Sequence, residues 1–336
     1  MHHNLSKQTE VNDFLATLTL KKIGNLLKNR ASFVWSVIAR SGSIAGAPVT
    51  LSIEPSACCQ LHCPECVLGA GMLKRHNRFI DFELYKKAIE QNKNTLCYLT
   101  LYFQGEPLLA PRFFDMVSYA VKSGIFTATS TNAQNIDDVI AEKIVASGLN
   151  KLIISLDGVT QQSYERYRKG GKIENVIAAI EKINDEKAKK SVSTPNIELQ
   201  FIVFRHNENE IGAFKRLAES LKVQKVTVKT AQIYDFQNKE NLIPTQQKFS
   251  RYTYKNSKWQ LRNKQHNFCL RQWQGSVITT DGEVVPCCFD KNAGFSFGRL
   301  QNSDFSEIWH GTQAARFRQR ILHNRADIEI CRNCSE

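Results

Sequence analysis

Short apolar runs alternate with segments of helical periodicity through the middle of the chain. In the helical segments apolar residues recur three and four positions apart, as they do on one face of an amphipathic helix. Strict alternation of strands and helices predicts a parallel sheet, and nearly continuous apolar strands are typical of sheets covered on both faces. The expected strands are 49–53, 98–103, 125–130, 152–156, 197–204 and 226–233, and the expected helices are 82–90, 113–121, 137–146, 176–183 and 211–221.

Six strand and helix units are too few for a closed eight-stranded barrel. The fold class that we predict is therefore α/β, a partial (β/α)6 TIM-like barrel. Ahead of it, residues 9–40 carry apolar residues at helical spacing with lysines and arginines between them, which predicts one or two amphipathic helices. The sequence leaves two alternatives for these helices: they pack on the main domain, or they contact a membrane surface.

The pattern changes after the sixth expected strand. Residues 235–265 are polar and lack sustained periodicity, which favours a linker. Beyond them two apolar pairs flank Asp281-Gly282, a strong hairpin signal, and a helix is expected over 305–321. The expected parts are a helical segment (1–48), the partial barrel (49–234), the linker (235–265) and a small α+β module (266–336).

Composition narrows the class of protein. No apolar stretch approaches eighteen residues, so we expect no membrane span. The ten cysteines fall mostly in two tight groups and the chain opens without a signal peptide, which favours metal binding in the cytoplasm over disulfides. The formal charge is +13, but lysine and arginine are scattered and not clustered with aromatic residues, so we expect no nucleic-acid partner. A zinc protein that contacts nucleic acid is kept as the alternative of another class.

The first cysteine group follows the first expected strand directly. Cys59, Cys63 and Cys66 have the spacing C-x3-C-x2-C on one loop, and three soft thiolates suit an iron-sulfur cluster. A cubane of four irons held by three cysteines leaves one iron open to bind a reactant. Structural zinc, with His62 or Cys58 as the fourth ligand, is the alternative.

This loop, its place after the first strand of a parallel barrel and the motifs at later strand ends resemble the radical S-adenosylmethionine (SAM) superfamily. The resemblance implies that Cys59, Cys63 and Cys66 hold a 4Fe-4S cluster whose open iron binds SAM. In that family, one-electron reduction cleaves SAM to methionine and a 5'-deoxyadenosyl radical, which abstracts a hydrogen from the substrate. An electron donor such as flavodoxin or ferredoxin is therefore also implied.

Polar residues at the strand ends match positions that contact SAM in similar enzymes. Gln104-Gly105-Glu106-Pro107 resembles the family motif Gly-Gly-Glu-Pro, and Arg168 resembles the arginine that pairs with the SAM carboxylate. Surface-turn roles stay open for several of these residues. One departure is Glu65, where relatives often place an aromatic residue against the adenine. The expected SAM-binding residues are Gly105, Glu106, Ser130, Asn132, Ser155, Asp157 and Arg168, together with Gln200, whose amide in an apolar strand is expected to point into the barrel.

The second cysteine group consists of Cys269, Cys287, Cys331 and Cys334, with a glycine in the intervening turn. Four thiolates from separate segments can close an iron-sulfur cluster or a zinc site. The pattern resembles the SPASM or shorter twitch domains of radical enzymes, including the aminocyclitol dehydrogenases, and this implies one auxiliary 4Fe-4S cluster.

Three further cysteines and one aspartate remain to be assigned. Cys288 is an alternative ligand of the auxiliary cluster, and Cys58 and Cys97 are expected to be small buried residues. Asp290 stands near the position of a catalytic base in some relatives, with a charged turn residue as the alternative.

The simplest reaction is the oxidation of an alcohol or similar carbon, with the auxiliary cluster accepting an electron. The expected substrate is a small molecule such as a sugar or cyclitol, or a peptide. A peptide-modifying maturase is the rival enzyme class, although residues 1–48 look too short and too helical for the peptide-clasping domain of such enzymes. Peripheral membrane contact through the helix over residues 9–40 is the remaining alternative.

Overall fold

A single nine-stranded sheet forms the centre of the computed structural model, which describes residues 10–263 and 265–335. The strand order is β11-β10-β9-β1-β2-β3-β4-β5-β6, and the strands from β1 to β6 are parallel. The six strands β1 to β6 of this sheet form the predicted partial barrel, and the α/β fold class is confirmed. Its strands are β1 (Thr50–Ile53), β2 (Tyr98–Thr100), β3 (Phe126–Thr131), β4 (Lys151–Ser155), β5 (Asn196–Val203) and β6 (Lys225–Thr230).

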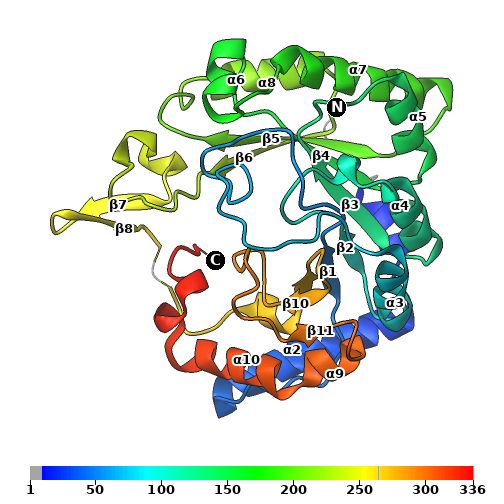
Figure 1. Ribbon diagram of the computed structural model, residues 1–336, viewed down its shortest axis with the longest axis vertical. Coiled ribbons are helices and arrows are strands. Elements are labelled where there is room, and N and C mark those ends of the chain that lie inside the picture. Colours follow the sequence, from blue (N-terminus) through cyan, green and yellow to red (C-terminus); the bar gives the residue numbers. More distant parts are fainter. Residues whose placement is uncertain (1–9, 264, 336) are drawn as a thin grey trace.

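Helices cover the outer side of the curved sheet (Figure 1). The five predicted helices are present within a few residues of their expected bounds, and the short α6 is an addition. Asp81 and Asp137 are the N-caps of α3 and α5: each side chain accepts a backbone N–H of the first helical turn and so fixes where the helix begins. The helices are α3 (Phe82–Asn92), α4 (Phe113–Lys122), α5 (Asp138–Ala146), α6 (Gln161–Tyr167), α7 (Ile173–Lys189) and α8 (Ile211–Ser220).

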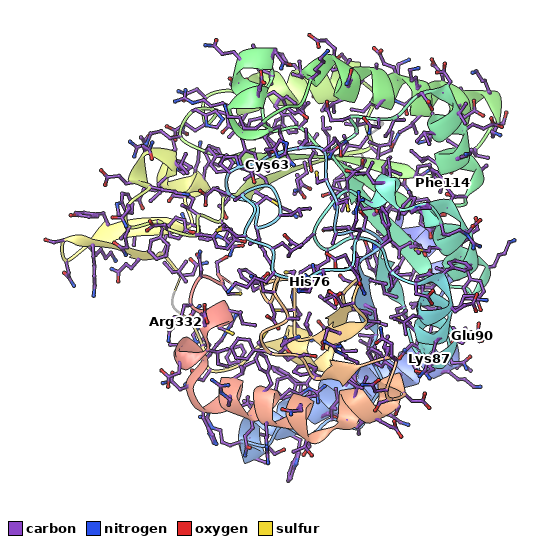
Figure 2. The ribbon with its side chains drawn as sticks, viewed as in Figure 1. Cys63, His76, Lys87, Glu90, Phe114 and Arg332 are labelled. Atoms are coloured by element: carbon purple, nitrogen blue, oxygen red, sulfur yellow. The ribbon has the colours of Figure 1, made fainter. Side chains whose placement is uncertain are left out.

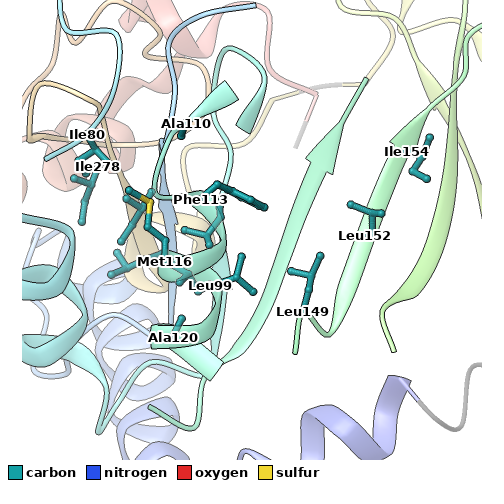
Figure 3. Close-up of a cluster of buried hydrophobic side chains, with 14 of the residues drawn as sticks. Ile80, Leu99, Ala110, Phe113, Met116, Ala120, Leu149, Leu152, Ile154 and Ile278 are labelled. Atoms are coloured by element: carbon teal, nitrogen blue, oxygen red, sulfur yellow. The ribbon is translucent and has the colours of Figure 1, made fainter. Parts of the chain in front are cut away.

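The C-terminal module extends the same sheet. β9 (Gly275–Ile278) pairs in parallel with β1, and the hairpin continues through β10 (Glu283–Val285) and β11 (Gly298–Arg299). In the shared core Ile278 of β9 lies beside Ile80 of the barrel (Figure 3). Neither the sheet nor the hydrophobic core is therefore interrupted at the predicted domain boundary.

Regular structure also occurs in the segment predicted as a linker. It contains short 3-10 turns and the hairpin of β7 (Tyr252–Lys255) and β8 (Lys258–Leu261). The hairpin turn places Asn256 and Ser257 at φ 51° and 59°, the left-handed pair that a two-residue turn between strands requires. The helix expected over 305–321 is two helices, α9 (Phe305–His310) and α10 (Thr312–Asn324), separated by the extended Gly311.

The predicted N-terminal helix is α2 (Leu20–Ala39), preceded by a helical turn over residues 10–16. The side chains that α2 buries are polar, namely Lys22, Asn25, Asn29 and Ser36. The helix therefore packs on the rest of the protein mainly through these polar groups, while the apolar Leu26, Phe33 and Val37 beside them are partly buried. Among the described residues, no helix combines the length and apolar character that a membrane crossing needs.

A buried ion pair joins the central strands. The carboxylate of Glu198 on β5 lies 2.7 Å from the ammonium of Lys151 on β4 and 3.1 Å from that of Lys225 on β6. The side chain of Glu198 is 7% exposed. Burial opposes the charge of Glu198, but the hydrogen bonds from Lys151, Thr227 and Lys225 outweigh it and lower its pKa to about 2. The pair therefore stabilises the sheet as long as Glu198 is ionised.

We expect Glu198→Gln to lower the melting temperature by several degrees at neutral pH, because Lys225 loses its ion pair and the buried Lys151 keeps only its pair with Glu10. A carboxylate with a lowered pKa stabilises the fold above its unfolded value of 4.5 and loses that contribution as the pH falls towards 2. The difference from the parent protein should accordingly narrow below pH 4.5 in thermal melts. Asp138→Asn, which removes the exposed pair with Lys182, is the control and should change the melting temperature little at any of these pH values.

Candidate active site

A cavity of about 310 Å³ lies among the carboxyl ends of the parallel strands, within the size range of small-molecule sites. Figure 2 marks Cys63 on the long loop that follows β1, in the middle of the molecule. Most of the residues predicted to bind the cluster and SAM line this one cavity. They are Cys59, Cys63, Cys66, Gly105, Glu106, Ser130, Asn132, Ser155, Arg168 and Gln200.

The cysteine loop is held so that its three thiols share the cavity. The sulfur of Cys59 accepts the backbone N–H of Leu61 at 3.4 Å and the amide of Asn132 at 3.5 Å. Burial raises the pKa of Cys59 to about 11 and raises that of Cys63 as well, so thiolates here need positive charge, which bound iron would supply. Cys58 instead bonds to Arg78, at 3.1 Å from its Nε. The donor set therefore fits a cluster on the three predicted cysteines.

Gly105 brings the second strand's end against the cysteine loop. Its φ is +71°, and a Cβ at this position would meet the carbonyl oxygen of Ser56 at 2.3 Å. This close approach lets the backbone N–H of Glu106 donate to the carbonyl of Cys58 at 2.7 Å. Only glycine satisfies both the left-handed backbone and the contact.

The carboxylate of Glu106 is buried at the cavity wall and accepts three hydrogen bonds from the protein. It accepts the hydroxyl of Thr131 at 2.8 Å and the backbone N–H groups of Asn132 at 2.8 Å and Leu108 at 3.2 Å. Burial raises the pKa of Glu106, and these donors act against that rise. Glu106 therefore ties the ends of β2 and β3 together at the cavity wall.

Asp157 is buried beside the cavity and holds Arg168. Its carboxylate accepts the Nε of Arg168 at 2.6 Å and the backbone N–H of Ile202 at 2.6 Å. Arg168 lines the cavity, whereas Asp157 does not and instead binds these two donors. Asp157 is thus placed to position the arginine, a role that the sequence did not suggest.

A second buried carboxylate, that of Glu54, links the cavity to the C-terminal module. The guanidinium of Arg75 binds it at 2.5 and 2.7 Å, and the backbone N–H groups of Thr280 and Gln104 donate to it at 3.0 and 3.2 Å. Glu54 is fully buried, and Arg75 also donates from Nε to the carbonyl of Lys291. One ion pair therefore fixes the cysteine loop, the Gly105 segment and the module together.

The four cysteines of the module gather around a second, small pocket with an apolar wall. Arg325 donates to the sulfur of Cys334 at 3.1 Å, and Cys288 is exposed. Burial raises the pKa of Cys331 to about 11. Arg271 and Arg325 line the same pocket. Four thiols with two cations beside them fit a second cluster, although no three His, Cys, Asp or Glu residues of the described chain are arranged for a single metal ion. The cysteines that line this pocket are Cys269, Cys287, Cys331 and Cys334.

Other cavity residues gave no signal in the sequence. Lys291 reaches the cavity from the module, and its ammonium donates to the hydroxyl of Tyr234 and lies 4.7 Å from the centre of that ring. Burial lowers the pKa of Lys291. Tyr102 and Lys229 line the same cavity.

Asp290, the predicted base, has both carboxylate oxygens on backbone N–H groups. It accepts the backbone N–H of Gly294 at 2.8 Å and that of Phe295 at 2.9 Å, and the residue is 2% exposed. These bonds close the turn that follows Cys287. The geometry is that of a carboxylate that holds a turn, and a catalytic role for Asp290 stays a prediction.

Comparison with known proteins agrees with this architecture. The sequence model of the radical SAM superfamily matches residues 53–218, and that of SPASM, an iron-sulfur cluster-binding domain, matches residues 269–335. The chain therefore belongs to the radical SAM superfamily and carries a C-terminal SPASM domain. These two domains imply 4Fe-4S clusters and SAM, as predicted from the cysteine pattern.

Individual relatives are distant. The chain is 25% identical over 173 residues to the mycofactocin maturase MftC of Mycobacterium ulcerans, a match that spans 52% of this chain and 45% of that protein. SuiB of Streptococcus suis bound to S-adenosylmethionine has a similar fold, with a TM-score of 0.64, 13% identity and coverage of 92% of this chain and 76% of SuiB. BtrN in complex with AdoMet and 2-DOIA gives a TM-score of 0.53 at 17% identity, covering 87% and 95% of the two chains.

We expect Gly105→Ala to reduce the iron bound per chain and the rate of SAM cleavage, because its Cβ cannot fit against the Ser56 carbonyl. Gly71→Ala is the matched control: its φ is +70°, and no atom lies within 4 Å of an added Cβ. Both variants carry the backbone strain of a left-handed alanine, so their difference reports the lost contact. Equal iron contents and rates for the two variants would contradict this account of Gly105.

Proposed function

We propose that this radical SAM enzyme oxidises its substrate by removing a hydrogen atom at the barrel cavity and passing an electron to the SPASM site. The observation that carries the proposal is the convergence of Cys59, Cys63 and Cys66 with the polar strand ends in one cavity. When bound, the cluster on these cysteines supplies the electron that cleaves SAM to methionine and a 5'-deoxyadenosyl radical.

The residues around the cavity orient SAM. Arg168, aligned by Asp157, presents a guanidinium suited to the SAM carboxylate. Polar side chains from successive strands, Ser130, Ser155 and Gln200, are available for the ribose and amino groups. Glu106 holds the strand ends in register, and its carboxylate at the cavity wall keeps acceptor capacity for the amino group of SAM.

The second cysteine pocket supports oxidation as the net reaction. An alcohol that becomes a carbonyl loses one hydrogen atom, one proton and one electron. The hydrogen atom would leave with 5'-deoxyadenosine and a base would take the proton. Cys269, Cys287, Cys331 and Cys334 would hold the cluster that can accept the electron. A flavodoxin or ferredoxin is the proposed source of the electron that starts each cycle.

Lys291 is the base that the geometry favours. It lies at the cavity wall four residues after Cys287, between the two cysteine sites, and burial lowers its pKa so that the neutral amine becomes accessible. Asp290 is the alternative, but its carboxylate is occupied by two backbone N–H groups.

A small molecule such as a sugar or cyclitol is the substrate that we propose first, because BtrN, which has a similar fold, has been solved in complex with AdoMet and 2-DOIA. Modification of a peptide is the second candidate. It is favoured by the sequence match to the mycofactocin maturase MftC and by the fold shared with SuiB, which has been solved bound to the precursor peptide SuiA.

We expect Cys59→Ser to abolish reductive cleavage of SAM and to lower the iron content from roughly eight per chain to roughly four. Cys58→Ser is the matched control: its sulfur faces Arg78, so both the iron content and the release of 5'-deoxyadenosine should stay near the parent values. Both readouts need only dithionite and SAM, so no substrate has to be known. Zinc in place of iron, or equal loss in the two variants, would contradict the proposal.

We expect Lys291→Gln to retain substrate-free SAM cleavage but to lower product formation by about a hundredfold or more, since the proton acceptor is gone. In the parent enzyme the product rate should rise with pH, because a lysine serves as a base only when neutral. Lys229→Gln, at the same cavity, should keep that pH profile. Oxidation of a cyclitol and peptide panel is the measurement, and an unchanged pH profile in Lys291→Gln would rule this base out.

A further inference from the structure

The helix α2 is attached to the protein by its polar face. Lys22 donates to the carbonyl of Gly124 at 2.6 Å, Asn25 and Asn29 donate to the carbonyl of Ala47 at 2.8 and 2.7 Å, and Ser36 donates to a nearby carbonyl at 2.8 Å. At 100° per residue, the side chains that make these bonds lie within one narrow sector of the helix. Hydrogen bonds in a buried position fix this orientation, because rotating the helix would leave the polar groups unpaired.

The opposite face of α2 is apolar and exposed. Leu20 is 88% exposed, Ile38 73% and Trp35 63%, although a surface helix of a globular protein normally turns such residues inward. The exposed residues fall within a stripe about 120° wide, opposite the bonded sector. They are Leu20, Ile23, Leu27, Val34, Trp35 and Ile38, named here the α2 stripe.

Cations flank the α2 stripe. By the same helical geometry, the exposed Lys21 and Lys28 lie along one side of it and the exposed Arg30 along the other. From residue 14 to residue 53 the sequence contains no Asp or Glu. The neighbouring α10, which Arg40 contacts through the carbonyl of Leu322, also lacks acidic residues.

We propose that the α2 stripe lies in the surface of an anionic lipid bilayer, with its flanking lysines and arginine at the headgroups. An apolar stripe bordered by cations on a helix that lies flat is the pattern that binds such interfaces. A second copy of the chain is a poorer occupant, since pairing two stripes would bring their cations together without any acid from residues 14–53. The proposal is independent of the reaction that the cavity performs.

The test is sedimentation of the full, anaerobically reconstituted chain with vesicles of phosphatidylcholine alone or mixed with phosphatidylglycerol. We expect binding to the mixed vesicles, accompanied by protection of Trp35 from aqueous quenching. The double variant Leu27→Gln/Ile38→Gln should lose binding. Val139→Gln, which removes an apolar side chain that is 57% exposed on α5, should bind as the parent does.

Charge is tested separately. The triple variant Lys21→Gln/Lys28→Gln/Arg30→Gln should bind mixed vesicles at least about tenfold more weakly. Iron content and substrate-free SAM cleavage should be unchanged in all of these variants, which shows that they fold. Failure of the parent to bind, equal binding by the Leu27/Ile38 variant, or a dimer that depends on α2 without vesicle binding would overturn the proposal.

Discussion

The carboxylate of Glu54 is the interaction on which the active site depends, because it joins segments that the chain order separates widely. It lies directly after β1, where the cysteine loop begins, and it receives Arg75, the backbone of Gln104 and the backbone of Thr280. A fully buried charge is costly unless it is paired and hydrogen-bonded, and here every donor comes from a segment that lines or borders the cavity. Satisfying this one carboxylate therefore sets the cysteine loop, the Gly105 turn and the SPASM domain in place at once.

The same logic of satisfied buried groups explains how much could be predicted from the sequence. Strands such as β4 and helices such as α7 could be predicted because the burial of one face produces a regular spacing of apolar residues in the sequence. The spacing of Cys59, Cys63 and Cys66 is visible because a cluster needs its ligands on one loop. The pairing of β9 with β1 left no local signal, since it depends on contacts between distant parts of the chain.

The sequence predicted the location of the site better than the roles of its individual residues. Ser130, Ser155 and Gln200 could be placed at the cavity because the ends of parallel strands meet there. Asp157 is at such an end too, but its carboxylate turns to Arg168 and the backbone of Ile202, a choice made by tertiary neighbours. The sequence pattern of α2 likewise identified an apolar stripe but could not say that buried polar residues, Lys22 among them, would hold the opposite face.

The attachment of α2 affects the whole enzyme because the helix contacts both the radical SAM domain and the SPASM domain. Lys22 bonds to the carbonyl of Gly124 before β3, within the radical SAM match, whereas Phe33 packs edge-on against Trp273 of the SPASM match. The helix is thus held at two positions along its length, one on each domain. Seating the α2 stripe on a surface would thus orient the barrel and the SPASM domain together, since the sheet that they share is continuous through β1 and β9.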